Sequence, residues 1–194
     1  MRKDFLILES LKFKGDCFKL FRRLRHHPHA FLLESSLRHK DYGRYSFMGC
    51  DPFFVFKGDG RSFLPNLRKH FEPFHFQKSQ CPTPFPTGIM GYLSYDYGLT
   101  LERVGSVRRA KGIFDGWFGF YDTVITIDHQ QSKIFICSSG WPEKTLAARK
   151  MRAQRRVQEI IFCLEIIYRY MLAFCSIISG RSIEIVVQLR FAIY

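Results

Sequence analysis

The chain carries the stretch Phe118-Gly-Phe-Tyr-Asp-Thr-Val-Ile-Thr-Ile127, in which apolar residues occupy both alternating positions. A run of this kind is typical of a strand that is covered on both faces. The polar segment 128–132 and the apolar segment Lys133-Ile-Phe-Ile-Cys137 follow it directly. Two apolar segments joined by a short polar turn predict an antiparallel hairpin.

Shorter strand and helix patterns lie on both sides of this hairpin. Helices are expected after Asp16 and Ser62, which are N-cap residue types, and from Trp141 onward, where Pro142 fits a first turn. Further strands are expected at 5–8, 30–33, 44–50, 53–57 and 89–95. Irregular segments are expected at 73–87 and 98–113.

Composition limits the classes of protein that fit the chain. The 194 residues are 46% hydrophobic and include 21 Phe, enough for a folded core. Six Cys show neither a CxxC pair nor the spacing of a zinc site, and Met1–Leu8 lacks the apolar length of a signal peptide. We therefore expect reduced thiols in a cytoplasmic protein.

The character of the sequence changes near residue 150. The net charge is +13, and its one local run is Arg149, Lys150, Arg152, Arg155 and Arg156. We interpret this run as a solvated helix face, because no aromatic stacking platform or DNA-reading motif accompanies it, and we expect proteolysis to begin there.

Residues 157–179 are strongly apolar, and their length would admit a membrane span. Glu165 and Arg169 make a span costly. The alternative is a packed amphipathic helix, with a stripe at Ile160, Leu164, Ile167 and Met171.

Three sequence blocks occur in a characteristic order. They are Phe31-Leu-Leu-Glu-Ser35 with Gly43-Arg-Tyr-Ser-Phe-Met-Gly49, Pro84-Phe-Pro-Thr-Gly-Ile-Met-Gly-Tyr-Leu-Ser-Tyr-Asp96, and Trp117-Phe-Gly-Phe-Tyr-Asp122. Together they resemble the N-terminal half of the chorismate-utilising synthases: anthranilate synthase component I and, more closely, aminodeoxychorismate (para-aminobenzoate) synthase component I of folate biosynthesis. The resemblance runs from about residue 3 to about residue 156.

The resemblance implies an α+β fold with two packed antiparallel β-sheets flanked by helices. It also implies ancestry in an enzyme that binds chorismate and Mg²⁺ and takes ammonia from a glutamine amidotransferase subunit. In this family the C-terminal half carries the metal carboxylates and the acid/base groups, and its motifs are not found here. We therefore expect an N-terminal domain at 1–150 and a divergent apolar tail at 151–194, with no catalytic residue and no metal site in this chain.

The N-terminal half of such proteins also forms a tryptophan pocket. Hydroxyls and backbone groups can hold an ammonium and a carboxylate, while aromatic rings enclose an indole. A simpler interpretation is that the two serines cap strand ends. By position, the candidate pocket residues are Ser35, Tyr42, Gly43, Arg44, Tyr45 and Ser46.

Other polar groups have simpler explanations. His26-His-Pro-His29 has no local Cys or carboxylate to complete a metal site, so a solvated turn is expected. The aspartates of Tyr95-Asp96 and Tyr121-Asp122 follow strand patterns and are expected to be turn or strand-end acceptors.

Three functions remain open. They are the N-terminal part of a chorismate-utilising synthase that is not catalytic alone, an aromatic amino acid binding module, and a basic protein that associates with membranes or nucleic acid. The order of the motifs favours the first, so we expect no nucleic-acid partner and no membrane association.

Overall fold

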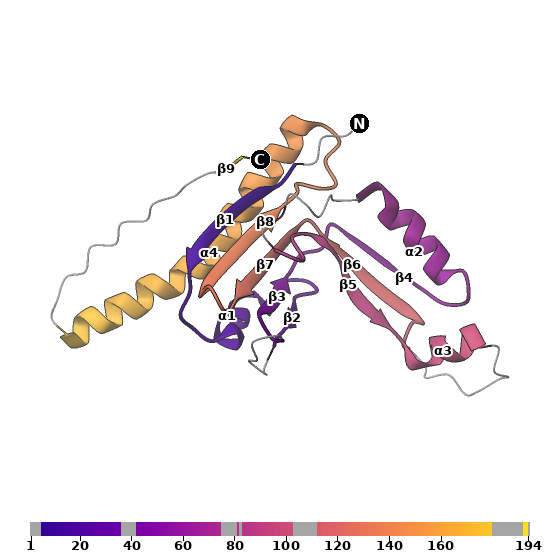
Figure 1. Cartoon of the computed structure of the whole chain (residues 1–194), viewed down its shortest axis with the longest axis horizontal. Coiled ribbons are helices and arrows are strands. Elements are labelled where there is room, and N and C mark those ends of the chain that lie inside the picture. The colour runs from indigo at the N-terminus through magenta and orange to yellow at the C-terminus, as the bar shows by residue number, and fades with distance from the viewer. Residues whose placement is uncertain are drawn as a thin grey trace.

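The computed structural model describes residues 5–35, 42–74, 81, 83–102, 112–179 and 192–193. In chain order the elements are β1 (Ile7–Lys12), α1 (Cys17–Leu24), β2 (Phe31–Leu33), β3 (Tyr45–Gly49), β4 (Phe54–Gly58), α2 (Phe63–Phe71), η1 (Glu72–Phe74), β5 (Gly88–Leu93), α3 (Tyr95–Glu102), β6 (Gly116–Tyr121), β7 (Thr123–Asp128), β8 (Lys133–Ser138), α4 (Leu146–Ser179) and β9 (Ala192–Ile193). Antiparallel sheets with helices beside them confirm the α+β fold class (Figure 1).

The larger sheet has six strands in the order β2-β3-β7-β8-β1-β9. Its centre is the hairpin of β7 and β8, in which Thr123 pairs with Ser138 and Asp128 with Lys133. This confirms the hairpin expected from the sequence. Helices α1 and α4 pack against the sheet, and the core that they enclose is aliphatic. Its fully buried members include Leu24, Met48, Ile125, Ile127, Ile136 and Val157.

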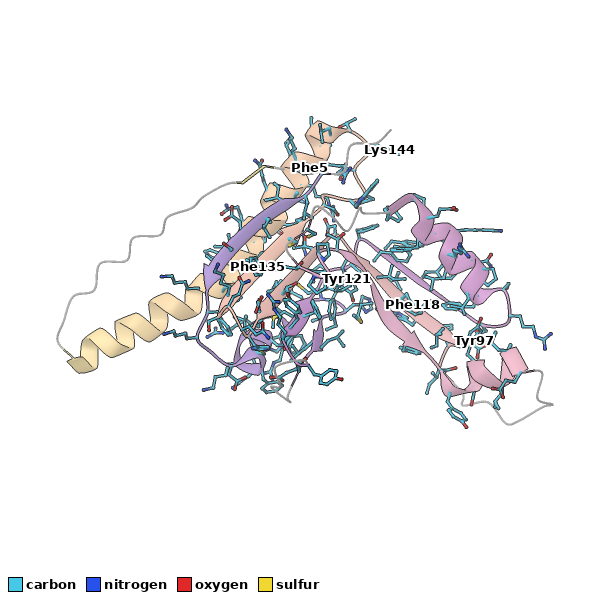
Figure 2. The ribbon with its side chains drawn as sticks, in the orientation of Figure 1. Phe5, Tyr97, Phe118, Tyr121, Phe135 and Lys144 are labelled. Carbon is cyan, nitrogen blue, oxygen red and sulfur yellow. The ribbon has the colours of Figure 1, made fainter. Side chains whose placement is uncertain are left out.

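The smaller sheet has three strands in the order β4-β6-β5. Its core is aromatic, because Phe63 of α2, Tyr97 of α3 and Phe120 of β6 are buried together. Figure 2 shows Tyr97 and Phe118 in this part of the molecule, and Phe5 and Phe135 in the part built on the larger sheet. Many of the Phe residues of the sequence therefore fill a separate core beside the aliphatic one.

The two sheets meet at Asp122, between the end of β6 and the start of β7. The single strand expected at 118–127 is therefore wrong: the chain bends there and enters a second sheet (Figure 1). The bend is held from both sides. The Tyr121 hydroxyl donates to the His29 carbonyl over 2.7 Å, and the Ser139 N–H donates to the Asp122 carbonyl over 2.9 Å.

Two helices, α3 and α4, start at residues that the sequence pattern did not predict. Helix α4 begins at Leu146 rather than at Trp141, because the Thr145 hydroxyl accepts from the Ala148 N–H over 3.2 Å and caps it. Helix α3 replaces part of the expected connection, and the Ser94 hydroxyl accepts from the Tyr97 N–H over 3.2 Å. In contrast, α1 follows its expected cap, with Asp16 accepting from the Phe18 N–H over 2.7 Å.

Helix α4 crosses the expected division at residue 150 without a break. Ala153, Val157, Ile160 and Leu164 belong to the aliphatic core, so the first part of the tail packs on the larger sheet. The division itself remains a prediction, and residues 180–191 of the tail lie outside the described residues. Within the described part, no helix combines the length and apolar character that a membrane span requires.

The basic run on α4 is a solvated face only in part: the Arg155 side chain is 65% exposed, but the expectation is wrong for Arg149 and Arg156. Arg149 and Arg156 are only 5% and 8% exposed. Arg149 Nε donates to the Ser139 carbonyl over 3.0 Å, and its guanidinium lies over the Trp141 ring. The positive charges of Arg149 and Arg156 therefore serve internal contacts with the Ser139 and Cys50 carbonyls.

Candidate functional site

The residues expected to form a tryptophan pocket lie around the start of β3. The Ser35 hydroxyl donates to the Tyr45 carbonyl over 2.9 Å, and the Ser35 N–H donates to Ser46 Oγ over 3.1 Å. Ser46 Oγ is also 2.8 Å from Nε2 of His129. The two serines therefore tie the segment after β2 to β3 and to the turn after β7.

Arg44 is held by Asp128 at the end of β7. Nη2 and Nε of Arg44 donate to Asp128 Oδ2 over 2.7 and 3.1 Å. The other carboxylate oxygen accepts from the backbone N–H groups of Gln130 and Gln131 over 2.9 and 3.0 Å. Burial acts to raise the pKa of Asp128, but these hydrogen bonds outweigh it and hold the pKa below its usual value.

The candidate residues divide between the two faces of β3, because successive side chains of a strand point to opposite sides. Ser46 is fully buried on the side of the aliphatic core. Tyr45 and Phe47 stack at 6.2 Å on the other side, and Phe47 meets the Phe85 ring edge-to-face at 5.8 Å. The second face therefore carries a row of three aromatic rings.

Gly43 and Tyr42 complete the set. Gly43, just before β3, has a φ of 74°. This angle lies in the left-handed region, which glycine adopts readily. Tyr42 is 71% exposed, so its ring lies at the surface. The pocket assignment as a whole remains a prediction. The arrangement agrees with serines that stabilise strand ends and with an aromatic row beside them.

Sequence reasoning missed His129 and Asp128. Asp128 ends β7 and His129 follows it, 84 and 83 residues from their partners Arg44 and Ser46. The available signal was the polar turn at 128–132: an Asp that opens a turn often binds the next N–H groups. Pairing of β3 with β7 then brings that turn to the candidate residues.

A second polar group lies at the corner between the sheets. Asp122 Oδ2 accepts from Arg152 Nε over 2.7 Å, and its other oxygen is 3.9 Å from Arg156 Nε. Burial raises the pKa of Asp122, against the opposing effect of both arginines. The expectation of a simple strand-end acceptor is wrong here, since the carboxylate is buried and ion-paired to α4.

Comparison with known proteins gives one consistent similarity. Anthranilate synthase component 1 of Geobacillus stearothermophilus is 27% identical over 146 residues, covering 63% of this chain and 28% of that protein. The Bacillus pumilus protein of the same name is also 27% identical over 146 residues, covering 66% of this chain and 28% of its own length. No family model matches the chain.

Among solved structures, anthranilate synthase component I from Streptococcus pneumoniae aligns with a TM-score of 0.48 and 20% identity. The alignment covers 64% of this chain and 33% of that structure. The chain thus spans little more than a quarter of the length of the curated relatives that it matches.

Proposed function

We propose that this chain is the N-terminal part of a chorismate-utilising synthase component I. The observation that carries the proposal is the 27% identity over 146 residues with two anthranilate synthase components. The wording of the sequence blocks at 84–96 and 117–122 favours the aminodeoxychorismate branch, whereas both curated relatives belong to the anthranilate branch. The proposal therefore takes the chemistry that both branches share, the transfer of an amino group to chorismate.

In this role the chain is a scaffold rather than a catalyst. Mg²⁺ prefers several free oxygen ligands, but the buried carboxylates Asp122 and Asp128 are each bonded to an arginine. Neither carboxylate therefore offers free oxygens to a magnesium ion, and no step of the reaction is derived through the ion. Catalytic groups are expected from polypeptide that corresponds to the rest of the relatives.

Exposed apolar side chains support a scaffold role. Large apolar side chains of the segments around the smaller sheet are open to solvent. They are Phe54, Tyr92, Leu93, Tyr95, Leu101 and Ile113. Under the proposed function, these side chains would be covered by further polypeptide of the same enzyme.

Complementation tests this function. The purified chain is assayed with chorismate, ammonia and Mg²⁺, alone and with the part of the Geobacillus stearothermophilus component that lies beyond the alignment. We expect no product from the chain alone and ammonia-dependent anthranilate or aminodeoxychorismate from the mixture. Product from the chain alone, or a mixture no more active than the added part, would refute the proposal.

The partner follows from the same proposal. A glutamine amidotransferase subunit would supply ammonia, so a glutamine-dependent reaction of the reconstituted mixture should need that subunit.

Tryptophan binding is a second candidate function, favoured by the aromatic row of Tyr45, Phe47 and Phe85 beside Ser35.

A further inference from the structure

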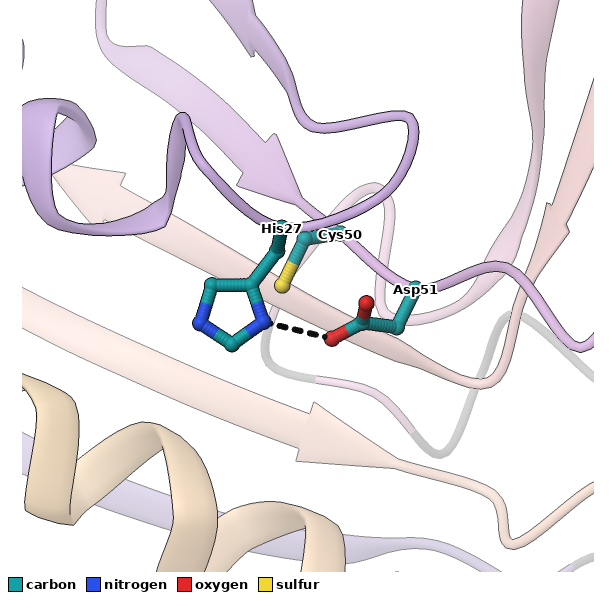
Figure 3. A group of neighbouring side chains, drawn as sticks. All are labelled: His27, Cys50 and Asp51. Atoms are coloured by element: carbon teal, nitrogen blue, oxygen red, sulfur yellow. Dashed lines mark hydrogen bonds and ion pairs between the residues drawn. The ribbon is translucent and has the colours of Figure 1, made fainter.

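His27, Cys50 and Asp51 bring three different donor atoms together. An imidazole nitrogen, a thiol sulfur and a carboxylate oxygen all lie within 4.8 Å of one another, and Figure 3 shows the three side chains converging. His27 belongs to the connection between α1 and β2, whereas Cys50 and Asp51 follow β3. The turn expected at His26–His29 is present, but the partners of His27 come from a distant segment that the local sequence did not indicate.

The backbone fixes this arrangement. The Asp51 N–H donates to the Pro28 carbonyl, and the His27 N–H donates to the Leu24 carbonyl, each over 2.9 Å. Asp51 has a φ of 53°, in a left-handed region that non-glycine residues adopt infrequently and often at functional sites. The three donors are thus positioned by main-chain contacts as well as by their own side chains.

We propose that His27, Cys50 and Asp51 bind a divalent metal ion of the zinc type, with water as the fourth ligand. Nitrogen and sulfur donors beside one carboxylate suit Zn²⁺, whereas Mg²⁺ and Ca²⁺ prefer oxygen alone. The side chains of His27 and Asp51 are 38% and 27% exposed, so an ion and its water can enter from solvent.

Binding requires a proton balance. Burial raises the pKa of the Cys50 thiol to about 12, so the metal displaces that proton to water as the sulfur–metal bond forms. Nδ1 of His27 lies 2.9 Å from Asp51 Oδ2. When Nδ1 holds the ion, the proton of the neutral ring lies on Nε2.

One group opposes a cation at this place. Arg156 Nη1 lies 3.5 Å from Asp51 Oδ2. The same nitrogen makes a shorter bond of 2.8 Å to Glu159 Oε2, and Nη2 donates to the Cys50 carbonyl over 3.3 Å. The guanidinium therefore keeps other partners when the ion takes the Asp51 carboxylate.

Cobalt binding tests the site independently of any chorismate chemistry. The full chain is stripped of metal with a chelator under reducing conditions and titrated with Co²⁺. We expect one ion per chain, a near-ultraviolet band from thiolate-to-cobalt charge transfer, and reversal by an equal amount of Zn²⁺. His27→Gln and Asp51→Asn should each weaken binding at least about tenfold, and Cys50→Ser should abolish the band.

Matched variants separate the site from other thiols and histidines. His26→Gln and Cys81→Ser should retain the band and the affinity of the parent chain. The half-exposed His27 and Asp51 variants report on the site even if the buried Cys50 variant does not fold. Absence of the band in the parent chain, or equal losses in the His26 and His27 variants, would overturn the proposal.

Discussion

Arg152 Nε donates to Asp122 Oδ2 over 2.7 Å, and this ion pair joins α4 to the residue at which the chain passes from one sheet to the other. The Asp122 side chain is 1% exposed, and that of Arg152 is 20% exposed. A buried ion pair adds little to stability compared with apolar packing, but removal of one partner leaves the other without compensation.

Asp122→Asn is therefore expected to lower the free energy of unfolding by about 3 kcal/mol. The amide retains the shape of the carboxylate but leaves the charges of Arg152 and Arg156 without their buried counter-charge. Urea unfolding followed by circular dichroism measures the loss.

Asp96→Asn is the matched control, because Asp96 also follows a Tyr but lies on α3, away from the corner. Its change should stay below about 1 kcal/mol. Equal losses in the two variants would contradict a special role for the corner ion pair.

The Arg44–Asp128 pair predicts a loss of stability in acid. Because the pKa of Asp128 is lowered in the folded state, its contribution is present above the unfolded pKa of about 4 and is lost as the pH falls through the folded value. Asp128→Asn should be less stable than the parent chain at neutral pH, and the difference should shrink in strong acid.

Urea unfolding over a series of pH values measures this difference. Asp16→Asn serves as control, since Asn caps a helix about as well as Asp and should leave the acid profile of the parent chain unchanged. A difference between the parent and Asp128→Asn that is constant with pH would contradict the prediction.

Local sequence signals predicted those parts of the fold that depend on neighbouring residues. Asp16 caps α1 as expected, and the turn at 128–132 joins β7 to β8. The bend at Asp122 could not be predicted in the same way. The apolar pattern continues through it, and the arginines that stabilise it lie 30 and 34 residues further along the chain.

The candidate sites show the same limit. Ser35 and Ser46 were found because they belong to a recognisable block, and their mutual hydrogen bond is consistent with that spacing. His129 and the pair Cys50–Asp51 were missed, because only strand pairing and the connection after α1 bring them to their partners. The sequence likewise shows that α4 carries a run of positive charges, but it does not show that Arg149 and Arg156 are buried.

Two glycines of neighbouring elements should respond oppositely to alanine. At Gly91 of β5, an added Cβ would collide with the backbone of β6 at Trp117 and Phe118. Gly91→Ala should therefore destabilise the chain by at least about 2 kcal/mol. At Gly98 of α3 nothing lies within 4 Å of the added atom, so Gly98→Ala should stabilise by up to about 1 kcal/mol.

Thermal and urea unfolding of the two variants measure both signs. An unchanged stability of Gly91→Ala would show that β5 and β6 are not paired as described, and a loss of stability in Gly98→Ala would contradict the open position on α3.

Tryptophan binding should be weak, with a dissociation constant of about 1 mM or higher. The Ser35 hydroxyl already donates to Tyr45, Ser46 is buried, and the ring of Tyr42 lies at the surface. Calorimetry measures the affinity. Micromolar binding that Ser35→Ala abolishes and the exposed control Ser10→Ala retains would contradict this prediction and favour a binding module.

Limited trypsin digestion should spare the basic run of α4. Arg149 and Arg156 are buried and bonded to the Ser139 and Cys50 carbonyls, and a protease needs several residues of locally unfolded chain around the bond that it cuts. The first cuts among the described residues should instead fall in exposed connections, such as after Lys14 between β1 and α1. Mass spectrometry of early fragments identifies them.

The corner ion pair provides the internal comparison for this experiment. Asp122→Asn releases the contact between α4 and the start of β7, so cleavage after Arg152 and Arg156 should appear earlier in this variant than in the parent chain. Asp96→Asn should keep the parent pattern. If the parent chain is cut first between Arg149 and Arg156, then α4 is not held against the larger sheet, and the burial of its arginines does not describe the protein in solution.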